Sequence, residues 1–475
     1  MDLGYSGVYS PKGWSAHGLR QEVGRVLYAG RRALCRPMRR SKARSVEVWE
    51  KSELGCDRGV GGKAKYMTEK QRKAALKRGR PAIAWPGEPL LGSWYGEEEI
   101  ETVVRTIRAS LDPTVGFGFI CEEIEEFERA FAAYCGTKHC VSINGAGGGL
   151  DMAVMSLDLD PGDEVIAPSI NFRASLMSII GQGGTLVVCE VDPKTLNVDP
   201  NDVERRISPR TRAILPTHMN GLSAPMDELL ELAARHPHPR HGPLKVIGDG
   251  ARACGGGYRG TKIGKKGWMN VFSFHTQKNM TTLGEGGALT TDDDALVTRL
   301  RGIRQFGGAV PESDPNLKRA GWGSNYKMTK VQAAVGLVQL ARLDGLIQDR
   351  RKLGQARSAM LADCPGLQLP YEPEGYEHSY YLYTLLAPKE WAGEKRDRLL
   401  ALLAEEYGVN SIVANPPCHR TIPFIRAHTR GQDLPVSDEV GGRLFCVPIH
   451  PRMSEEDNEF IAAAVWDAVE RVRRA

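Results

Sequence analysis

Short apolar runs alternate with longer segments of helical periodicity from residue 97 onward. Seven runs have the length and apolar content of buried strands: HCVSI, DEVIAP, TLVVCEV, TRAILPTH, LKVIGD, VFSFH and GALTT. Amphipathic segments of helical length separate most of them, and strands connected in this way form a parallel sheet covered by helices on both faces. The pattern therefore predicts an α/β fold whose large domain is built on a mostly parallel, seven-stranded sheet.

The pattern changes at both ends of this region. Two segments with acidic first turns, YGEEEIETVVRTIRASL and CEEIEEFERAFAAYCG, predict helices ahead of the first strand, and Gly136 is placed to cap the second. A long helix is expected within residues 324–361, and the tail after it alternates strand and helix like a small α+β domain. We therefore expect an N-terminal arm at 67–96, a large domain at 97–345, and the end of the linking helix with a small C-terminal domain at 346–475.

Residues 1–66 differ from the rest in composition and charge. They contribute +8 to the net charge of +5, so the remaining chain carries −3. The segment is rich in Arg, Gly and Ser and has no sustained period, and it lacks the apolar core of a secretory signal. A basic nucleic-acid arm, a transit-like segment and a mis-assigned start are the alternatives. We favour a disordered segment or a true start at Met67.

Composition limits the class of protein. Hydrophobic residues make up 41% and charged residues 25% of the 475 positions, which is typical of a soluble globular chain of two or three domains. No stretch approaches eighteen uninterrupted apolar residues, so no membrane span is expected, and the weakly acidic body does not predict nucleic-acid binding. The ten cysteines form no Cys-x-x-Cys pair, which indicates reduced thiols in a cytoplasmic protein.

Four features follow predicted strands, at the sheet edge where parallel α/β folds bind ligands. NGAGGG at 144–149 is a glycine-rich turn that offers backbone N–H groups to an anion or serves tight packing. Asp249 is a buried carboxylate or a helix N-cap. Phe172, taken alone, is more typical of a core aromatic residue, and Lys278 is a desolvated amine nucleophile or an exposed loop lysine.

Together these four features match the requirements of pyridoxal 5′-phosphate. In such sites a lysine forms the Schiff base, an aspartate pairs with the pyridinium nitrogen so that the ring can accept electrons, an aromatic side chain covers the ring, and a glycine-rich segment holds the phosphate. No Gly-Lys-Ser/Thr follows the glycines, so a Walker loop is disfavoured.

One further motif invites a metal-site interpretation. HPHPRH contains His236, His238 and His241, but its prolines and its position between a helix and a strand favour a solvated loop, so no metal site is predicted.

The chain resembles the DegT/DnrJ/StrS family of PLP-dependent sugar aminotransferases over roughly residues 90–470. The segments that carry the resemblance are EEIEEFERAFAAYCGTKHCVSI, LDPGDEVIAPSINFRAS, VIGDGARACGG, FSFHTQKNMTTLGEGGALTTDD, GSNYKMTKVQAAVGLVQLARLD and PPCHRTIPF. The resemblance implies the fold type I PLP-transferase architecture, which is aspartate-aminotransferase-like, with a smaller C-terminal α+β domain.

The same resemblance implies residue roles. Lys278 matches the Schiff-base lysine, Asp249 the acid at the pyridine nitrogen, Phe172 the stacking aromatic residue and Ser273 a phosphate ligand. Asn325 matches an asparagine that reaches the cofactor of the neighbouring subunit, so a homodimer with a shared active site is implied.

Two positions depart from the family pattern. The phosphate loop lacks its usual hydroxyl, so the N–H groups of Ala146, Gly147 and Gly148 must carry more of the contact. Arg252 stands where Gln or His is usual, and a cation there would favour the ionised ring hydroxyl of the cofactor. His275 and Lys327 are candidate substrate contacts.

The expected reaction is transfer of an amino group from glutamate or glutamine to a keto-sugar, either nucleotide-linked or 3-oxo-glucose 6-phosphate. The second substrate follows from HTQKNMTTLGEGG and NYKMTK, which resemble the kanosamine-pathway subgroup. A PLP-dependent sugar dehydratase is the alternative within the family, although dehydratases with 3-deoxygenation chemistry carry His at the position of Lys278. A regulatory protein that keeps the fold without turnover is the alternative from another class.

Overall fold

The computed structural model describes residues 66–307 and 321–474, so the predictions for residues 1–65 lie outside it. Its centre is a seven-stranded sheet in the order β1-β9-β8-β5-β4-β2-β3. The strands in that order are His139–Ile143, Gly287–Thr291, Met269–Ser273, Lys245–Asp249, Thr211–Ile214, Glu164–Pro168 and Thr185–Cys189. Six strands run in the same direction and β9 is antiparallel to both of its neighbours, which confirms the predicted mostly parallel sheet.

Alternate residues of each strand point to opposite faces of the sheet, and helices cover both faces. On β2, for example, Val165 and Ala167 join one buried cluster and Ile166 joins another. The first face is covered by α4 (Ala146–Met155), α5 (Arg173–Gly181) and α8 (Asp294–Arg304). The second face is covered by α3 (Glu122–Cys135), α6 (Pro200–Arg206), α7 (Met226–Arg235) and α9. This is the two-sided covering that the alternating pattern predicts.

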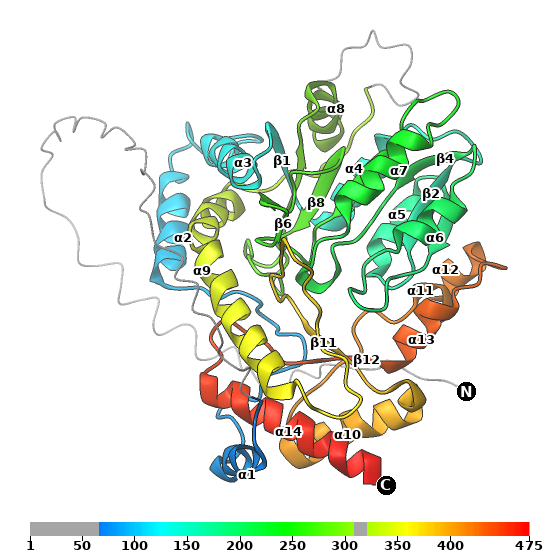
Figure 1. Cartoon of the computed structure of the whole chain (residues 1–475). Helices are drawn as coiled ribbons and strands as arrows, with labels where there is room; N and C mark the ends of the chain where they lie inside the picture. The colour runs from blue at the N-terminus through cyan, green and yellow to red at the C-terminus, as the bar shows by residue number, and fades with distance from the viewer. Residues whose placement is uncertain (1–65, 308–320, 475) are drawn as a thin grey trace, which may run out of the picture. The chain divides into compact units, whose positions relative to one another are not determined.

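Helix α9 (Lys330–Leu361) connects the sheet to a second core. It begins with a capping box at Thr329 and Gln332 and spans the domain boundary expected at residue 345. Its second half packs on the C-terminal elements, which lie next to it in Figure 1. These are β11 (Tyr383–Leu386), β12 (Leu444–Val447), α10 (Glu394–Tyr407) and α14 (Glu455–Arg474).

Shorter elements complete the described chain. They are η1 (Met219–Gly221), β6 (Gly257–Tyr258), β7 (Thr261–Lys262), β10 (Tyr376–Glu377), η2 (Lys389–Trp391), α11 (Cys418–Thr421), α12 (Pro423–His428) and α13 (Pro435–Arg443). The helices include none long and apolar enough to span a bilayer, within the residues described.

The N-terminal arm packs on the last helix of the chain. Helix α1 (Glu69–Arg78) lies against α14, where Met67, Ala75 and Ala463 form a small apolar cluster (Figure 1). Beyond α1 the arm continues without regular structure, and its backbone groups form hydrogen bonds with distant segments. Gly92 donates to the carbonyl of Thr276 at 2.9 Å, and a side chain at Gly92 would collide with the backbone of Gln277. The arm is therefore part of the folded body.

Helix α2 (Glu97–Ala109) exposes its apolar side. Its residues Glu99, Thr102 and Thr106 are buried, whereas Ile100 is 53% and Ile107 is 46% exposed. Helix periodicity predicts the helix correctly, but an amphipathic helix ordinarily turns its apolar side toward its own core. The buried side is instead satisfied by polar contacts, since Glu99 accepts hydrogen bonds from Gln339 and from the backbone of Gly96.

Candidate active site

A cavity of about 330 Å³ opens at the carboxyl ends of the central strands. Eight of the predicted site residues line it: Ala146, Gly147, Phe172, Asp249, Arg252, Ser273, His275 and Lys278. Three others do not line it within their own chain: Gly148, Asn325 and Lys327. The sheet thus gathers these eight residues from four segments far apart in sequence around one opening.

Lys278 follows β8 and faces the cavity. Its backbone N–H donates to the carbonyl of His275 at 2.9 Å, which closes a turn that aims the side chain inward. The amine Nζ donates to Tyr381 Oη at 3.0 Å and lies 4.6 Å from the centre of the Tyr381 ring. Burial lowers the pKa of Lys278, and the positive charge of Arg252 lowers it further, to about 7. An amine with this pKa is substantially neutral, and therefore nucleophilic, at neutral pH.

Asp249 ends β5 and is buried at 4% exposure. Ser175 of α5 donates its hydroxyl to Asp249 Oδ2 at 2.5 Å, and the Ala251 N–H donates to Oδ1 at 3.1 Å. The residues that follow form turns, so the alternative of a helix N-cap is wrong. Each carboxylate oxygen accepts one hydrogen bond, and the carboxylate can accept another from a ligand in the cavity.

The glycine-rich segment is the first turn of α4 and not a turn that precedes the helix. Gly145 is the N-cap and the helix begins at Ala146. The glycines are needed for close approach: a Cβ at Gly149 would overlap Ile143 and one at Gly148 would lie 2.8 Å from the Tyr326 ring. A Cβ at Gly147 would meet nothing within 4 Å, because that position faces the cavity.

The start of α4 has the character of an anion site. Its first turn contains no acidic residue, and its unpaired N–H groups carry the positive end of the helix dipole. The hydroxyl of Ser273, at the end of β8, lines the same cavity and accepts a hydrogen bond from the His275 N–H at 3.3 Å. A phosphate would find backbone and hydroxyl donors here.

Phe172 and Arg252 form another wall. Phe172 precedes α5 and is 52% exposed, so the alternative of a core aromatic residue is wrong. Arg252 is buried, with its guanidinium carbon 5.8 Å from the Phe172 ring centre and 5.4 Å from that of Tyr381. The guanidinium donates a hydrogen bond to Asn220 Oδ1 that is long, at 3.4 Å. The positive charge of Arg252 is therefore directed at the cavity.

Several further residues of the cavity were missed by the sequence analysis. Asn171 and Thr217 line it and are buried, yet their side chains have no hydrogen-bond partner among the described residues. Unpaired buried polar groups are costly, which favours a bound ligand as their partner. Asn171 precedes the predicted Phe172, so the sequence could have predicted that it lies at the same edge of the sheet. Glu88, from the arm, could not be predicted in this way, because nothing in the local pattern connects it with β8.

Asn325 and Lys327 lie outside the cavity of their own chain. Lys327 Nζ donates to Asn325 Oδ1 at 2.7 Å, and the Asn325 carbonyl accepts from Asn144 Nδ2 at 3.2 Å. Lys327 also lies 4.6 Å from the centre of the Phe306 ring, which is 61% exposed. Both residues are thus on an outward-facing part of the described chain.

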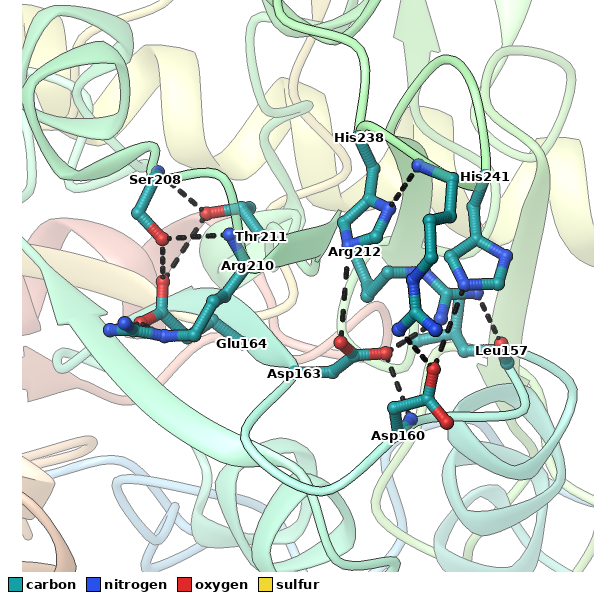
Figure 2. A network of polar contacts seen from close by, with 11 residues as sticks. Leu157, Asp160, Asp163, Glu164, Ser208, Arg210, Thr211, Arg212, His238 and His241 are labelled. Atoms are coloured by element: carbon teal, nitrogen blue, oxygen red, sulfur yellow. Dashed lines mark hydrogen bonds and ion pairs between the residues drawn. The ribbon is translucent and has the colours of Figure 1, made fainter.

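The histidine run is not a fully solvated loop. His238 is buried beside Asp163, with 3.9 Å between His238 Nε2 and Asp163 Oδ1 (Figure 2). His236 is partly exposed and His241 is exposed. Burial lowers the pKa of His238, and the charge of Arg212 lowers it further. The expectation of a solvated loop is therefore wrong for His238, which packs against an ion pair.

Potential ligand atoms of Asp160, Asp163 and His241 lie within 4.8 Å of one another. Arginines already neutralise both carboxylates: Arg212 donates to Asp163 Oδ2 at 2.6 Å, and Arg240 donates to Asp160. The network in Figure 2 therefore gives no support to a bound cation.

A larger hollow of about 490 Å³ lies beside α3, β1 and α8. Its walls carry opposite charges that are already paired, since Arg304 donates to the Glu128 carboxylate and to the Ser142 carbonyl. It brings together no acid, nucleophile and anion site of the kind found around Lys278, so we assign the chemistry to the smaller cavity.

Comparison with known proteins identifies the family to which the chain belongs. The profile described as the DegT/DnrJ/EryC1/StrS aminotransferase family matches residues 97–466. The chain is 37% identical over 347 residues to GDP-perosamine synthase of Caulobacter vibrioides, covering 72% of this chain and 89% of that protein. It is 32% identical over 385 residues to spore coat polysaccharide biosynthesis protein SpsC of Bacillus subtilis, covering 79% and 95%.

A solved structure extends the likeness to three dimensions. The crystal structure of S. venezuelae DesV in complex with a ketimine intermediate is similar with a TM-score of 0.70 and 33% identity, covering 79% of this chain and 96% of that one. The profile match, the curated relatives and the shared fold agree, and the chain belongs to the DegT/DnrJ/EryC1/StrS aminotransferase family.

Proposed function

We propose that the protein is a PLP-dependent transaminase that moves an amino group from glutamate or glutamine to a keto-sugar. The observation that carries the proposal is the pairing, in one cavity, of a lysine amine whose pKa is lowered to about 7 with the buried carboxylate of Asp249. A desolvated amine and an opposed carboxylate are the groups that pyridoxal phosphate requires of a protein.

The residues of the cavity fit this cofactor. The start of α4 and the Ser273 hydroxyl would hold the phosphate, and Asp249 would accept from the pyridine nitrogen. Phe172 would cover the ring, and the orphaned polar atoms of Asn171 and Thr217 offer additional hydrogen bonds. When bound, pyridoxal phosphate supplies a carbonyl for the amine and a ring that accepts electrons.

Lys278 would have two functions in this site. Its neutral amine attaches the cofactor covalently, and after an amino donor has replaced it, the same amine moves a proton as general base and acid. The presence of lysine at this position argues against the dehydratase alternative, and a complete lysine and aspartate pair argues against a regulatory protein without turnover.

A lysine substitution tests the function. Lys278→Ala should abolish the visible absorbance of the bound cofactor, and borohydride should no longer fix the cofactor on the peptide that contains residue 278. Formation of 2-oxoglutarate from glutamate should stop, whereas Lys352→Ala, at an exposed lysine paired with Glu455, should behave like the parent. Transamination that persists in Lys278→Ala would overturn the assignment.

The substrate proposal rests on the relatives. GDP-perosamine synthase and the dTDP-3-amino-3,4,6-trideoxy-alpha-D-glucose transaminase of Streptomyces venezuelae, 33% identical over 384 residues, both have names that contain a nucleotide-linked sugar. We therefore favour a nucleotide-linked keto-sugar over 3-oxo-glucose 6-phosphate. Mass spectrometry of products from GDP-linked and dTDP-linked keto-sugars, with 3-oxo-glucose 6-phosphate in parallel, distinguishes the two.

We also propose a homodimer. The exposed apolar residues Ile100, Val104 and Ile107 form a stripe on α2 that a second copy would cover. Asn325 faces away from its own cavity, as expected of a residue that completes the site of a partner.

A further inference from the structure

A buried hydrogen-bond chain connects Lys278 with the N-terminal arm. Lys278 Nζ donates to Tyr381 Oη at 3.0 Å, and Tyr381 Oη in turn donates to a carboxylate oxygen of Glu88. Glu88 belongs to the arm and Tyr381 to the segment that leads into β11, so the three residues come from separate parts of the chain. Tyr381 has no measurable exposure, so water does not compete for its hydroxyl.

The direction of each hydrogen bond follows from the chemistry of the groups. A phenol has one proton, and burial raises the pKa of Tyr381, so the hydroxyl stays protonated. It uses this proton to donate a hydrogen bond to the Glu88 carboxylate. Its oxygen lone pairs are then left to accept from the Lys278 amine. If the proton pointed at the amine instead, Glu88 would face the phenolic oxygen with no proton between them.

Buried side chains hold the backbone on both sides of the Glu88–Tyr381 hydrogen bond. Arg350 of α9 is completely buried; it donates to the carbonyl of Gly92 at 2.5 Å and to that of Tyr380 at 3.0 Å. One guanidinium therefore ties the arm, four residues after Glu88, to the residue that precedes Tyr381. His450 Nε2 lies 3.0 Å from the Leu91 carbonyl and provides a further contact to the arm.

We propose that Glu88 and Tyr381 are positioning residues for the Lys278 amine: the carboxylate orients the phenol, and the phenolic oxygen holds one N–H of the amine in place. We call the hydrogen-bonded series Glu88–Tyr381–Lys278 the relay. The inference rests on the proposed function, because the relay ends at the lysine that would attach the cofactor and move the proton. Holding one N–H fixes the direction of the nitrogen lone pair, which is the part of the group that reacts.

Other charged groups face the same amine and must be separated from the relay. Those acting on the charge of Lys278 are Arg252, Glu88, Asp249 and Glu285. Arg252 disfavours the ammonium form, whereas the three carboxylates favour it. Of these carboxylates, Glu88 accepts the hydrogen bond from Tyr381, so a coupled response of positions 88 and 381 identifies the relay.

The first test measures the lysine without the cofactor. Trace acetic anhydride labels neutral amines, and mass spectrometry of the peptide that contains Lys278, taken across pH, gives the midpoint of its titration. Glu88→Gln should lower this midpoint by about one pH unit, because a negative charge that favours the ammonium is lost. Tyr381→Phe should lower it as well, because the ammonium loses an acceptor.

The double variant is decisive. If Glu88 acts through Tyr381, Glu88→Gln should shift the midpoint clearly less in the Tyr381→Phe background than in the parent. Equal shifts in the two backgrounds would mean that Glu88 acts only through space, and the relay would be wrong. Tyr383→Phe is the matched control, since it removes a buried hydroxyl bonded to Ser358 outside the cavity, and its midpoint should equal that of the parent.

A kinetic test accompanies the titration. Tyr381→Phe and Glu88→Gln should lower kcat for the donor half-reaction by about 10- to 100-fold and leave KM for the donor within about threefold, because the proton-transfer group is misplaced while the donor site is intact. A kcat within twofold of the parent in both variants contradicts the relay. The proposed function is tested separately, since only activity retained by Lys278→Ala would overturn it.

Discussion

Arg252 stands at a position where the resemblance to the family predicts Gln or His. Its guanidinium is buried and faces the rings of Phe172 and Tyr381, and its hydrogen-bond acceptor among the described residues is an amide oxygen. A buried cation without a carboxylate bonded to it raises the potential of the whole cavity and favours anionic ligand groups. It also lowers the pKa of Lys278, in addition to the effect of burial.

Arg252→Gln should therefore raise the titration midpoint of Lys278. The pKa of about 7 results from burial first and from the Arg252 charge second, so removing the charge moves it upward by about one pH unit while burial keeps it below the usual lysine value. Acetic anhydride labelling of Lys278 across pH measures the change. The sign is opposite to that expected for Glu88→Gln, and a downward or absent shift would contradict this account of the cavity.

At the level of elements, the first turn of α4 contains one glycine that packs against the sheet and another that faces the cavity. Gly149 is held against β1 and β8, since a Cβ there would overlap Ile143 and lie 2.8 Å from Val271 Cγ1. Gly147, two residues earlier on the same helix, has open space toward the cavity. Gly149 is required by close packing, whereas Gly147 leaves space for a ligand, although the two lie in one glycine-rich run of the sequence.

The two alanine substitutions should therefore give opposite results. Gly149→Ala should destabilise the cofactor-free protein by about 1–3 kcal/mol, because the helix must move away from the sheet. Gly147→Ala should leave the free energy of unfolding unchanged or slightly higher, because alanine favours helix, and should weaken cofactor binding about tenfold. Urea unfolding and cofactor titration measure the two effects. Parent-like cofactor affinity in Gly147→Ala would place the phosphate elsewhere.

The elements that sequence reasoning predicted well are those with a local signal. The seven strands, the C-terminal glycine cap at Gly136 and the residues that follow strand ends all depend on neighbours in sequence, and the structure has them. Glu88 and Tyr381 were missed because their pairing depends on how the arm docks, which no local pattern records. The buried polar side of α2 was missed because the amphipathic pattern does not say which side meets the core.

For the whole molecule, the stripe on α2 predicts the state of assembly. Ile107→Glu should shift the protein from dimer to monomer, because a carboxylate in a covered apolar surface would be desolvated without a partner. Activity should fall in parallel and recover in part at high protein concentration, since Asn325 would come from the second copy. Sedimentation measures the mass, and Arg105→Glu, an exposed change on α2 off the stripe, should remain dimeric. An active monomeric parent would contradict the proposal.

The docking of the arm has a consequence for biosynthesis. Glu88 is among the first described residues to leave the ribosome, but its partner Tyr381 is made 293 residues later. At 5–20 residues per second this interval lasts roughly 15–60 s. A nascent chain can thus build the central sheet and present Lys278 well before the carboxylate can reach Tyr381. The Lys278 amine is fully positioned only after Tyr381 has been synthesised, so a chain that terminates before Tyr381 contains the lysine without its relay.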